Sequence, residues 1–237
     1  MNSERKMAKS IVFDTGPIIS LATNSLLWLL KPLKDKFRGD FYITAGVKWE
    51  LVDRPLEIKK FKFEALMVLS NIKDSTIEVI DEEKVRQQTE KLLDIANHIY
   101  KAKGNWINIV HSGEMQALAA AIMMNSSALV VDERTTRVLV EEPERLKDVL
   151  EHKLHINLEV NKQNLNDFSR MVKNIKVIRS TELVMIAYEM GLLDKFLPDI
   201  QNPKKMLLEG VLWGVKLHGC SISQREIDTL VKIEAKT

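Results

Sequence analysis

The feature that most constrains the fold is a short apolar run, Ser10 to Phe13, which ends abruptly at Asp14. Strand-forming residues bounded by turn residues predict a buried β-strand. Thr15-Gly16-Pro17 follows, and a proline near the start of a new apolar pattern predicts a helix with Thr15 as its N-cap. Asp14 is therefore expected between a strand and a helix amino end, where ligands bind in open α/β sheets.

Strand and helix patterns alternate along the rest of the chain. The 128–131 run is apolar throughout, which is typical of a strand buried on both faces of a parallel sheet. Lys31-Pro32 is expected to end or kink the first helix. The alternation predicts an α/β fold with a mainly parallel sheet. Strands are expected at 10–13, 41–43, 75–80, 128–131 and 176–178, and helices at 18–30, 44–52, 56–71, 82–100, 113–124, 134–140, 181–193, 204–217 and 223–233.

We expect a single domain over 1–237, because the chain is long enough to bury a substantial core and shows no repeat or linker. Its core is predicted at about 9–197, and a charged elaboration at about 141–179 is expected on the surface. Residues of about 204–237 are predicted to form closing helices, a helical C-terminal extension. The segment 103–106 is expected to be a break between elements.

Composition excludes several classes of protein. The net charge is only +2, so any nucleic-acid-binding surface must be local. A single cysteine, Cys220, forms no internal disulfide and provides no cysteine framework for a metal, which fits a cytoplasmic protein. No membrane span is expected, because the longest apolar stretch contains Asp14, and a central Asp costs roughly 2.5–3.5 kcal/mol on insertion.

Acidic residues recur at one predicted position, the carboxyl edge of the sheet. Glu50 lies in the helix after the second strand, Glu114 lies at a helix start where Ser112 is the expected N-cap, and Asp132 ends the 128–131 strand. Together with Asp14 these carboxylates would repel one another unless a cation lay between them. All-oxygen ligation suits Mg²⁺ or Mn²⁺, which activate water and stabilise phosphodiester oxygens. The placement predicts a metal-dependent phosphodiesterase in which Asp14, Glu50, Glu114 and Asp132 are both metal ligands and catalytic residues.

The same residues carry a family resemblance. The segment 12–19 (VFDTGPII) resembles the opening motif of PIN-domain nucleases, and 43–52 (ITAGVKWELV) resembles their second acidic motif. The segment 113–119 (GEMQALA) is similar to the Gly-Glu-x-x-Ala helix start of a toxin-like PIN subgroup, and 130–137 (VVDERTTR) to that subgroup's Asp-Asp-x-x-x-Arg motif. Gly191-Leu192-Leu193 and Ile222-Ser223 resemble its closing helices. Glu133 departs from the pattern, because a second Asp is common there.

The resemblance implies a three-layer α/β/α sandwich around a mainly parallel sheet. It further implies Mg²⁺- or Mn²⁺-dependent endonucleolytic cleavage of RNA, often by the toxin of a toxin–antitoxin pair. Position by position, Asp14, Glu50, Glu114 and Asp132 match the family's acidic quartet. The resemblance also implies RNA and an antitoxin protein as partners, and assembly of the chain as a homodimer.

Simpler roles remain open for each residue. Asp14 and Asp132 could cap helices, Glu50 could be a solvated helix residue, and Glu114 could complement a helix dipole. Several other polar residues could belong to the site or have a structural role. The structural roles are N-caps for Thr15 and Ser180 and a structural acid for Glu133. Arg137 and Arg134 could be ion-paired or could bind phosphate.

Two other functions also remain open. The altered Asp132-Glu133 pair and the long elaboration are compatible with a non-catalytic RNA-binding or assembly module that keeps a PIN-like fold. A nuclease directed at DNA would use the same carboxylates.

Overall fold

The computed structural model describes residues 9–197 and 199–234. A five-stranded sheet lies at its centre, in the order β3-β2-β1-β6-β8, and all neighbouring pairs are parallel. Its strands are β1 (Ser10–Phe13), β2 (Asp40–Thr44), β3 (Glu78–Ile80), β6 (Ala128–Val130) and β8 (Val177–Ile178). Because the strands run parallel, the residues that follow β1 and β6 lie at the same edge of the sheet.

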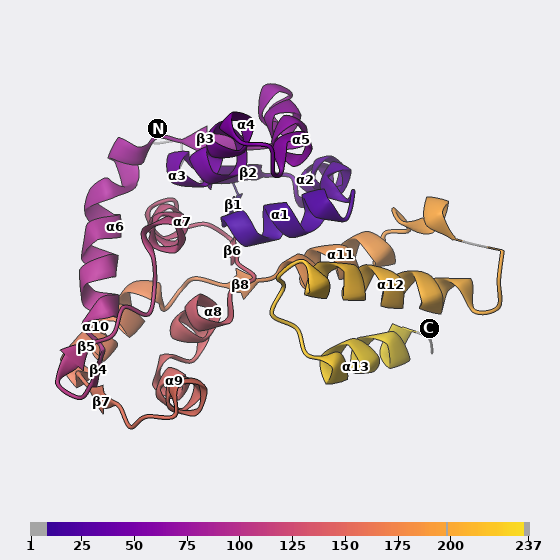
Figure 1. The fold of residues 1–237 in the computed structure, drawn as a ribbon. Helices are drawn as coiled ribbons and strands as arrows, with labels where there is room; N and C mark the ends of the chain where they lie inside the picture. The colour runs from indigo at the N-terminus through magenta and orange to yellow at the C-terminus, as the bar shows by residue number, and fades with distance from the viewer. Residues whose placement is uncertain (1–8, 198, 235–237) are drawn as a thin grey trace, which may run out of the picture.

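Each face of the sheet has its own hydrophobic core, so the molecule has three layers (Figure 1). Along β1, Ile11 and Phe13 pack on one face and Val12 packs on the other, as the twofold alternation of a strand requires. Both faces are covered, which explains why β1 after Ser10, and all of β6, are apolar. The prediction of an α/β/α sandwich around a mainly parallel sheet is confirmed.

Helices from both halves of the chain cover the face that buries Phe13. They are α1 (Thr15–Thr23), α2 (Leu30–Phe37), α5 (Lys62–Lys73), α11 (Ser180–Glu189), α12 (Pro203–Leu217) and α13 (Gln224–Glu234). The opposite face is covered by α6 (Glu82–Asn97), α7 (Ser112–Met123), α8 (Arg134–Glu141), α9 (Leu146–Leu154) and α10 (Lys162–Val172). Short helical segments join these elements: η1 (Leu27–Leu29), α3 (Ala45–Lys48), η2 (Trp49–Asp53), α4 (Arg54–Glu57), η3 (Pro143–Arg145) and η4 (Asp194–Phe196).

The first helix is shorter than predicted. α1 ends at Thr23, and Ser25 adopts a left-handed conformation with φ of 57°. The chain then continues through η1 into α2, which contains Pro32 in its first turn. The expectation that Lys31-Pro32 ends or kinks the first helix is wrong, because that helix has already ended at Thr23. A helix tolerates Pro32 in its first turn, where the missing N–H would have no partner within the helix.

Two other predicted segments also differ from the structure, and both contain residues with positive φ. The helix expected at 56–71 begins only at Lys62, after Phe61 with φ of 61°. The expected break at 103–106 is a hairpin between β4 (Tyr100–Ala102) and β5 (Asn105–Trp106), with Lys103 and Gly104 at positive φ. β7 (Glu159–Val160) pairs with β4 to complete a small antiparallel sheet.

The segment 141–179 is not confined to the surface as expected. Leu150 of α9 and Phe168 of α10 are buried in the core beside the central sheet, and β8 is an edge strand of that sheet. Charged exposed faces on α9 and α10 hid these apolar positions.

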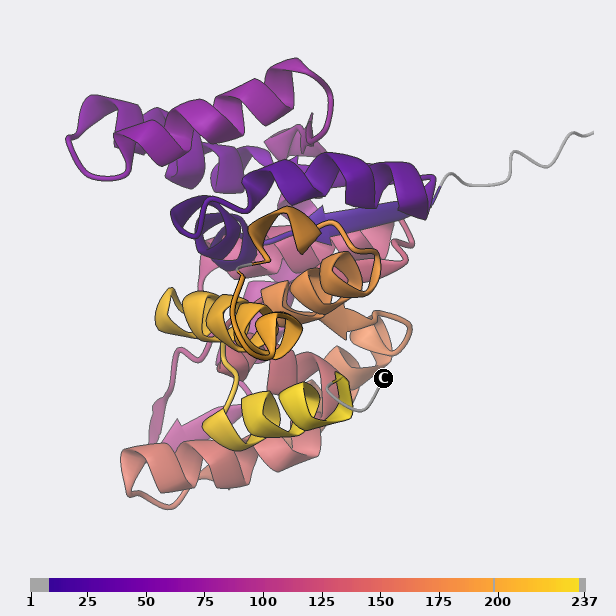
Figure 2. The ribbon, with the colours of Figure 1, turned by 90° about the vertical axis from the view of Figure 1, so that its right-hand side faces the viewer.

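The closing helices belong to the main core. Leu212 of α12 and Ile227 of α13 are fully buried in the same cluster as Ile18 of α1. Figure 2 faces α12 and α13 and shows them beside α11, below α1. Within 9–197 and 199–234, no helix is both long and apolar enough to cross a membrane.

Candidate functional site

Asp14 lies where β1 ends and α1 begins, as predicted. Its backbone N–H donates to the carbonyl of Val130 (2.9 Å), which continues the β1–β6 pairing to the sheet edge. Its side chain is only 8% exposed. Burial, with a smaller contribution from the charges of Glu114 and Glu50, raises the pKa of Asp14 to about 7, against the lowering effect of the backbone N–H groups of Thr15 and Gly16. Asp14 therefore faces at least two of the predicted acids.

Glu50 approaches the same edge from η2. The hydroxyl of Thr15 donates to Glu50 Oε2 at 2.6 Å, so Thr15 is not the N-cap of α1, a position that Asp14 occupies. A β-carbon on Gly113 would lie 3.2 Å from Glu50 Oε1. Glycine at this position lets the amino end of α7 lie close to the Glu50 carboxylate.

Glu114 lies in the first turn of α7, and its side chain points back toward the amino end of that helix. Its Oε2 accepts from the backbone N–H of His111 (3.1 Å), the residue at the N-cap position that was expected for Ser112. Burial raises the pKa of Glu114, and the charge of Glu133 adds to that effect. The charge of Glu114 thus acts on Asp14, and the charge of Glu133 acts on Glu114.

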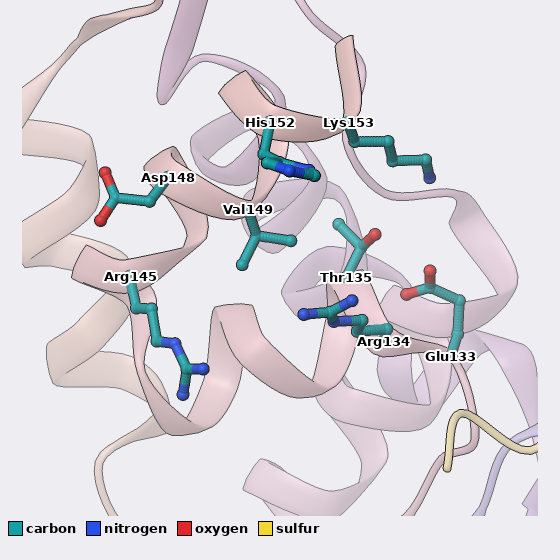
Figure 3. Close-up of a pocket in the computed structure, with 8 residues that line it drawn as sticks. All are labelled: Glu133, Arg134, Thr135, Arg145, Asp148, Val149, His152 and Lys153. Carbon is teal, nitrogen blue, oxygen red and sulfur yellow. The ribbon is translucent and has the colours of Figure 1, made fainter. Parts of the chain in front are cut away.

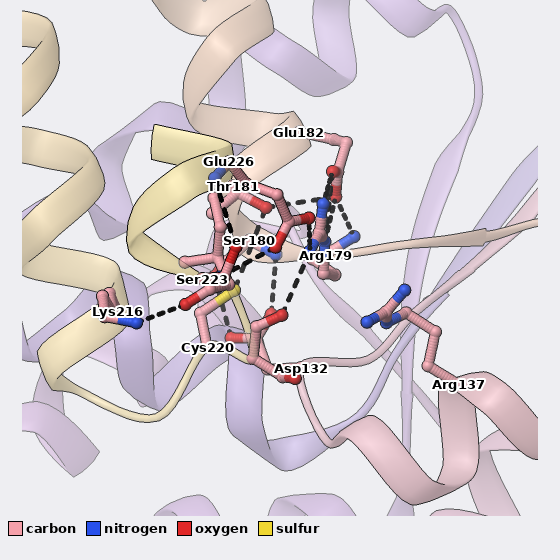
Figure 4. Close-up of polar contacts among 12 residues, drawn as sticks. Asp132, Arg137, Arg179, Ser180, Thr181, Glu182, Lys216, Cys220, Ser223 and Glu226 are labelled. Atoms are coloured by element: carbon pink, nitrogen blue, oxygen red, sulfur yellow. Dashed lines mark hydrogen bonds and ion pairs between the residues drawn. The ribbon is translucent and has the colours of Figure 1, made fainter. Parts of the chain in front are cut away.

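Asp132 also follows a strand at this edge, but its carboxylate is held by hydroxyl groups. Oδ1 accepts from the Ser180 backbone N–H (2.8 Å), and Oδ2 accepts from the hydroxyls of Ser180 (2.8 Å) and Ser20 (3.0 Å). The residue is 2% exposed. Figure 4 shows Asp132 and Ser180 within a polar network that reaches the closing helices. Asp132 therefore links the site to α1 and α11 through buried hydrogen bonds.

Arg179 is the main cation of that network and was missed by the sequence reasoning. It pairs with Glu182 (2.6 Å) and Glu226 (3.1 Å) and donates to the carbonyl of Ser221 (3.0 Å). Burial lowers the pKa of Arg179, but these two glutamates outweigh burial and raise it overall. Ser20, the other missed residue, had a signal in the sequence, because it is a hydroxyl in an otherwise apolar stretch.

The secondary residues have distinct positions. Glu133 is the N-cap of α8 and accepts from the Thr136 N–H at 2.6 Å. Ser180 is the first residue of α11 and bonds Asp132 rather than capping its own helix. Arg137 lies one turn into α8 and is 3.4 Å from Glu141.

The family match agrees with this geometry. A family model described as PIN domain matches residues 10–142, more than half of the chain. The chain belongs to the PIN domain family. No curated protein matches the chain closely enough to add to this.

PIN domains are generally nucleases and typically use divalent metal ions. Asp14, Glu50, Glu114 and Asp132 all lie inside the matched segment, whereas α9 to α13 lie beyond it. In this PIN domain the donor set at the edge consists of carboxylate oxygens, which suits a hard divalent cation. Among the described residues, no three acidic, histidine or cysteine side chains converge closely enough to form a coordination cluster.

Proposed function

We propose that this PIN domain is a metal-dependent endoribonuclease that hydrolyses RNA phosphodiester bonds. The observation that carries the proposal is Asp14, a buried carboxyl whose pKa is raised to about 7 by burial and by the facing charges of Glu114 and Glu50. A carboxyl in such surroundings either keeps its proton or binds a cation. Asp14 lies at the carboxyl edge of a parallel sheet, and ligands bind at this edge in such folds.

Asp14, Glu50 and Glu114 would hold Mg²⁺ or Mn²⁺. When bound, the cation supplies Lewis-acid stabilisation of the phosphodiester and activation of water. Thr15 orients Glu50 through its 2.6 Å hydrogen bond, and the His111 N–H orients Glu114. Asp132 as a fourth ligand stays a prediction, and Glu133 is a competing candidate because its charge acts directly on Glu114.

The test is cleavage of an unstructured RNA with Mn²⁺ or Mg²⁺. Wild type should cleave, and Asp14→Asn should lose at least 100-fold in rate, because removing a group that stabilises the transition state costs several kcal/mol. Asp94→Asn on the exposed face of α6 is the matched control and should cleave like wild type. Equal cleavage by wild type and Asp14→Asn would remove Asp14 from the mechanism.

A second candidate is a non-catalytic RNA-binding or assembly module. It is favoured by Asp132, whose carboxylate is already occupied by three hydrogen bonds. Calorimetric titration with Mn²⁺ separates the two candidates, because a module without a metal site should bind no Mn²⁺ at millimolar concentration. Parallel digests of RNA and single-stranded DNA separate the endoribonuclease from a DNA-directed nuclease.

The role of a toxin in a toxin–antitoxin pair, and a homodimer, are further parts of this proposal. They are supported by the likeness of the 113–119 and 130–137 segments to the toxin-like subgroup. Co-expression with the product of a neighbouring gene tests the first, since an antitoxin should co-purify and suppress cleavage. Light scattering of the purified chain tests the second.

A further inference from the structure

Two pockets adjoin one another along α8. One, of about 650 Å³, lies between the start of α8 and α9 and is lined by Glu133, Arg134, Arg145 and Lys153 among others (Figure 3). The other, of about 760 Å³, lies between α8 and the turn after α12. Arg134 and Arg145 line both pockets, so they form one continuous surface, which we call the α8 trough.

Basic side chains dominate the α8 trough. Three arginines and two lysines line it: Arg134, Arg137, Arg145, Lys153 and Lys216. Three acids also line it, Glu133, Asp148 and Glu226, and Glu226 pairs with Arg179 at 3.1 Å. Arg145 is paired with Glu142 at 2.8 Å, so Arg134 and Arg137 are the arginines most available to a ligand. The whole chain carries a net charge of only +2, so this concentration of cations is local. Such a surface attracts an anion.

Arg137 shows an unmet hydrogen-bonding requirement in the α8 trough. Its side chain is 23% exposed, and its ion pair with Glu141 is long, at 3.4 Å. Arg137 Nε is buried, and none of the described residues accepts a hydrogen bond from it. In Figure 4 the guanidinium stands apart from the network around Asp132. An unsatisfied buried donor is costly, and phosphate and carboxylate oxygens are both strong acceptors for a guanidinium.

The trough begins beside the acidic site. Glu133, which lines it, also acts on Glu114 through its charge. A phosphodiester chain with one linkage at the carboxylates would therefore have its neighbouring phosphates close to Arg134 and Arg137. Each pocket has a volume in the range of sites for small organic ligands.

We propose that the α8 trough binds the phosphates of a single-stranded nucleic acid on one side of the bond that is cut, through Arg134 and Arg137. This inference deepens the proposed function, since it assigns a substrate-binding surface to the same site. Arg134 is exposed and makes the outer contact. Arg137, one turn further along α8, makes the inner one.

The test is equilibrium binding of labelled single-stranded RNA and DNA 10-mers in EDTA, where no cleavage occurs, over a range of KCl concentrations. Each lost phosphate contact reduces the slope of log K against log salt by about 0.7 for a single strand. The Arg134→Ala/Arg137→Ala variant should lose about 1.4 from that slope and about tenfold or more in affinity. Arg134→Ala alone should lose about half of the slope change.

The matched control is Lys84→Ala/Lys91→Ala, which removes the same charge from exposed positions on α6. It should keep the wild-type slope. Arg134→Lys/Arg137→Lys should recover most of the slope, because it restores both charges. Equal losses in the trough variant and the α6 control, or no loss in either, would overturn the proposal.

This experiment separates the two proposals. If wild type cleaves RNA while the trough variant binds like wild type, the trough fails and the nuclease stands. If wild type cleaves nothing but its binding depends on Arg134 and Arg137, the nuclease fails and the trough stands. Tighter binding of RNA than of DNA identifies RNA as the ligand, and equal binding shows that the trough reads only the phosphate chain.

Discussion

Asp14 connects the chemistry of the site to the stability of the fold. Its pKa rises from 3.8 to about 7, mainly because the side chain is buried. Between these values, the folded protein keeps a proton on Asp14 that the unfolded chain has released. A carboxyl with a raised pKa therefore makes the fold less stable as pH rises from about 4 to about 7.

In EDTA, Asp14→Asn should remove this dependence. At about 1.4 kcal/mol per pKa unit, the variant should be more stable than wild type by up to about 4 kcal/mol at pH 8, and nearly equal to it at pH 4. Urea unfolding at pH 4, 6 and 8 measures the difference. Asp94→Asn serves as the control, and a wild-type pH slope that survives in Asp14→Asn would contradict the assignment.

Asp132 is expected to matter for folding before it matters for metal. Its carboxylate accepts three hydrogen bonds from buried donors on Ser20 and Ser180. Removing the acceptor leaves the two Ser180 donors unsatisfied, at about 1–3 kcal/mol each, whereas the Ser20 hydroxyl keeps the His218 carbonyl (3.2 Å) as an acceptor. Asp132→Ala should therefore destabilise the protein by about 3–5 kcal/mol in EDTA. Wild-type stability of this variant in urea, combined with lost Mn²⁺ binding, would instead assign Asp132 to the metal.

The positions of the site residues were predictable from the sequence, but their partners were not. Asp14, Glu114 and Asp132 lie where strand–helix alternation places them. The Asp132 carboxylate accepts a hydrogen bond from Ser180, which is far away along the chain. The spacing of residues in the sequence does not reveal such a partner. The same holds for Thr15, whose hydroxyl bonds Glu50 instead of capping α1.

At the scale of elements, one glycine sets how closely two helices approach, and a second glycine offers a comparison. A β-carbon on Gly46 of α3 would lie 2.1 Å from Oε1 of Gln116, a buried side chain of α7 that contacts Thr44. Gly210 of α12 has open space where its β-carbon would be. Both are helical, so alanine gains up to about 1 kcal/mol of helix propensity at either position.

Gly46→Ala should nevertheless destabilise the protein by about 1–2 kcal/mol. Overpacking costs about 1–3 kcal/mol, which exceeds the gain in propensity, because the buried Gln116 amide must move away from Thr44. Gly210→Ala, the matched control, should be neutral or more stable. Thermal unfolding of both variants checks this, and stabilisation by Gly46→Ala would show that Gln116 moves freely.

Element types were largely predictable, whereas boundaries and long-range packing were not. The apolar run that ends at Asp14 specified β1, and the regular helix after Ser112 specified α7. Breaks occur at residues with positive φ, such as Ser25 and Phe61, whose residue types do not favour that conformation. The charged 141–179 segment concealed Phe168, because one buried ring in a polar helix gives a weak pattern.

At the scale of the whole molecule, the core extends beyond the family match. The matched segment ends at residue 142, yet the cluster around Phe13 also contains Leu212 of α12 and Ile227 of α13. The turn between these helices is tied to the site edge, because the Ser221 N–H donates to the Asp132 carbonyl at 3.1 Å. The prediction of a single domain therefore has a direct test.

A fragment of residues 1–197 should fail to fold cooperatively. It lacks six buried aliphatic side chains of that cluster, Leu208, Leu212, Val215, Ile222, Ile227 and Val231, besides Cys220. Burial of each stabilises by about 1.5–3 kcal/mol, so their loss is comparable with the whole stability of a typical domain. The full chain should unfold in one sharp transition in urea, whereas the fragment should unfold gradually and bind a dye for exposed apolar surface. A sharp transition in the fragment would show that α12 and α13 are an appendage, because the remaining core would then suffice on its own.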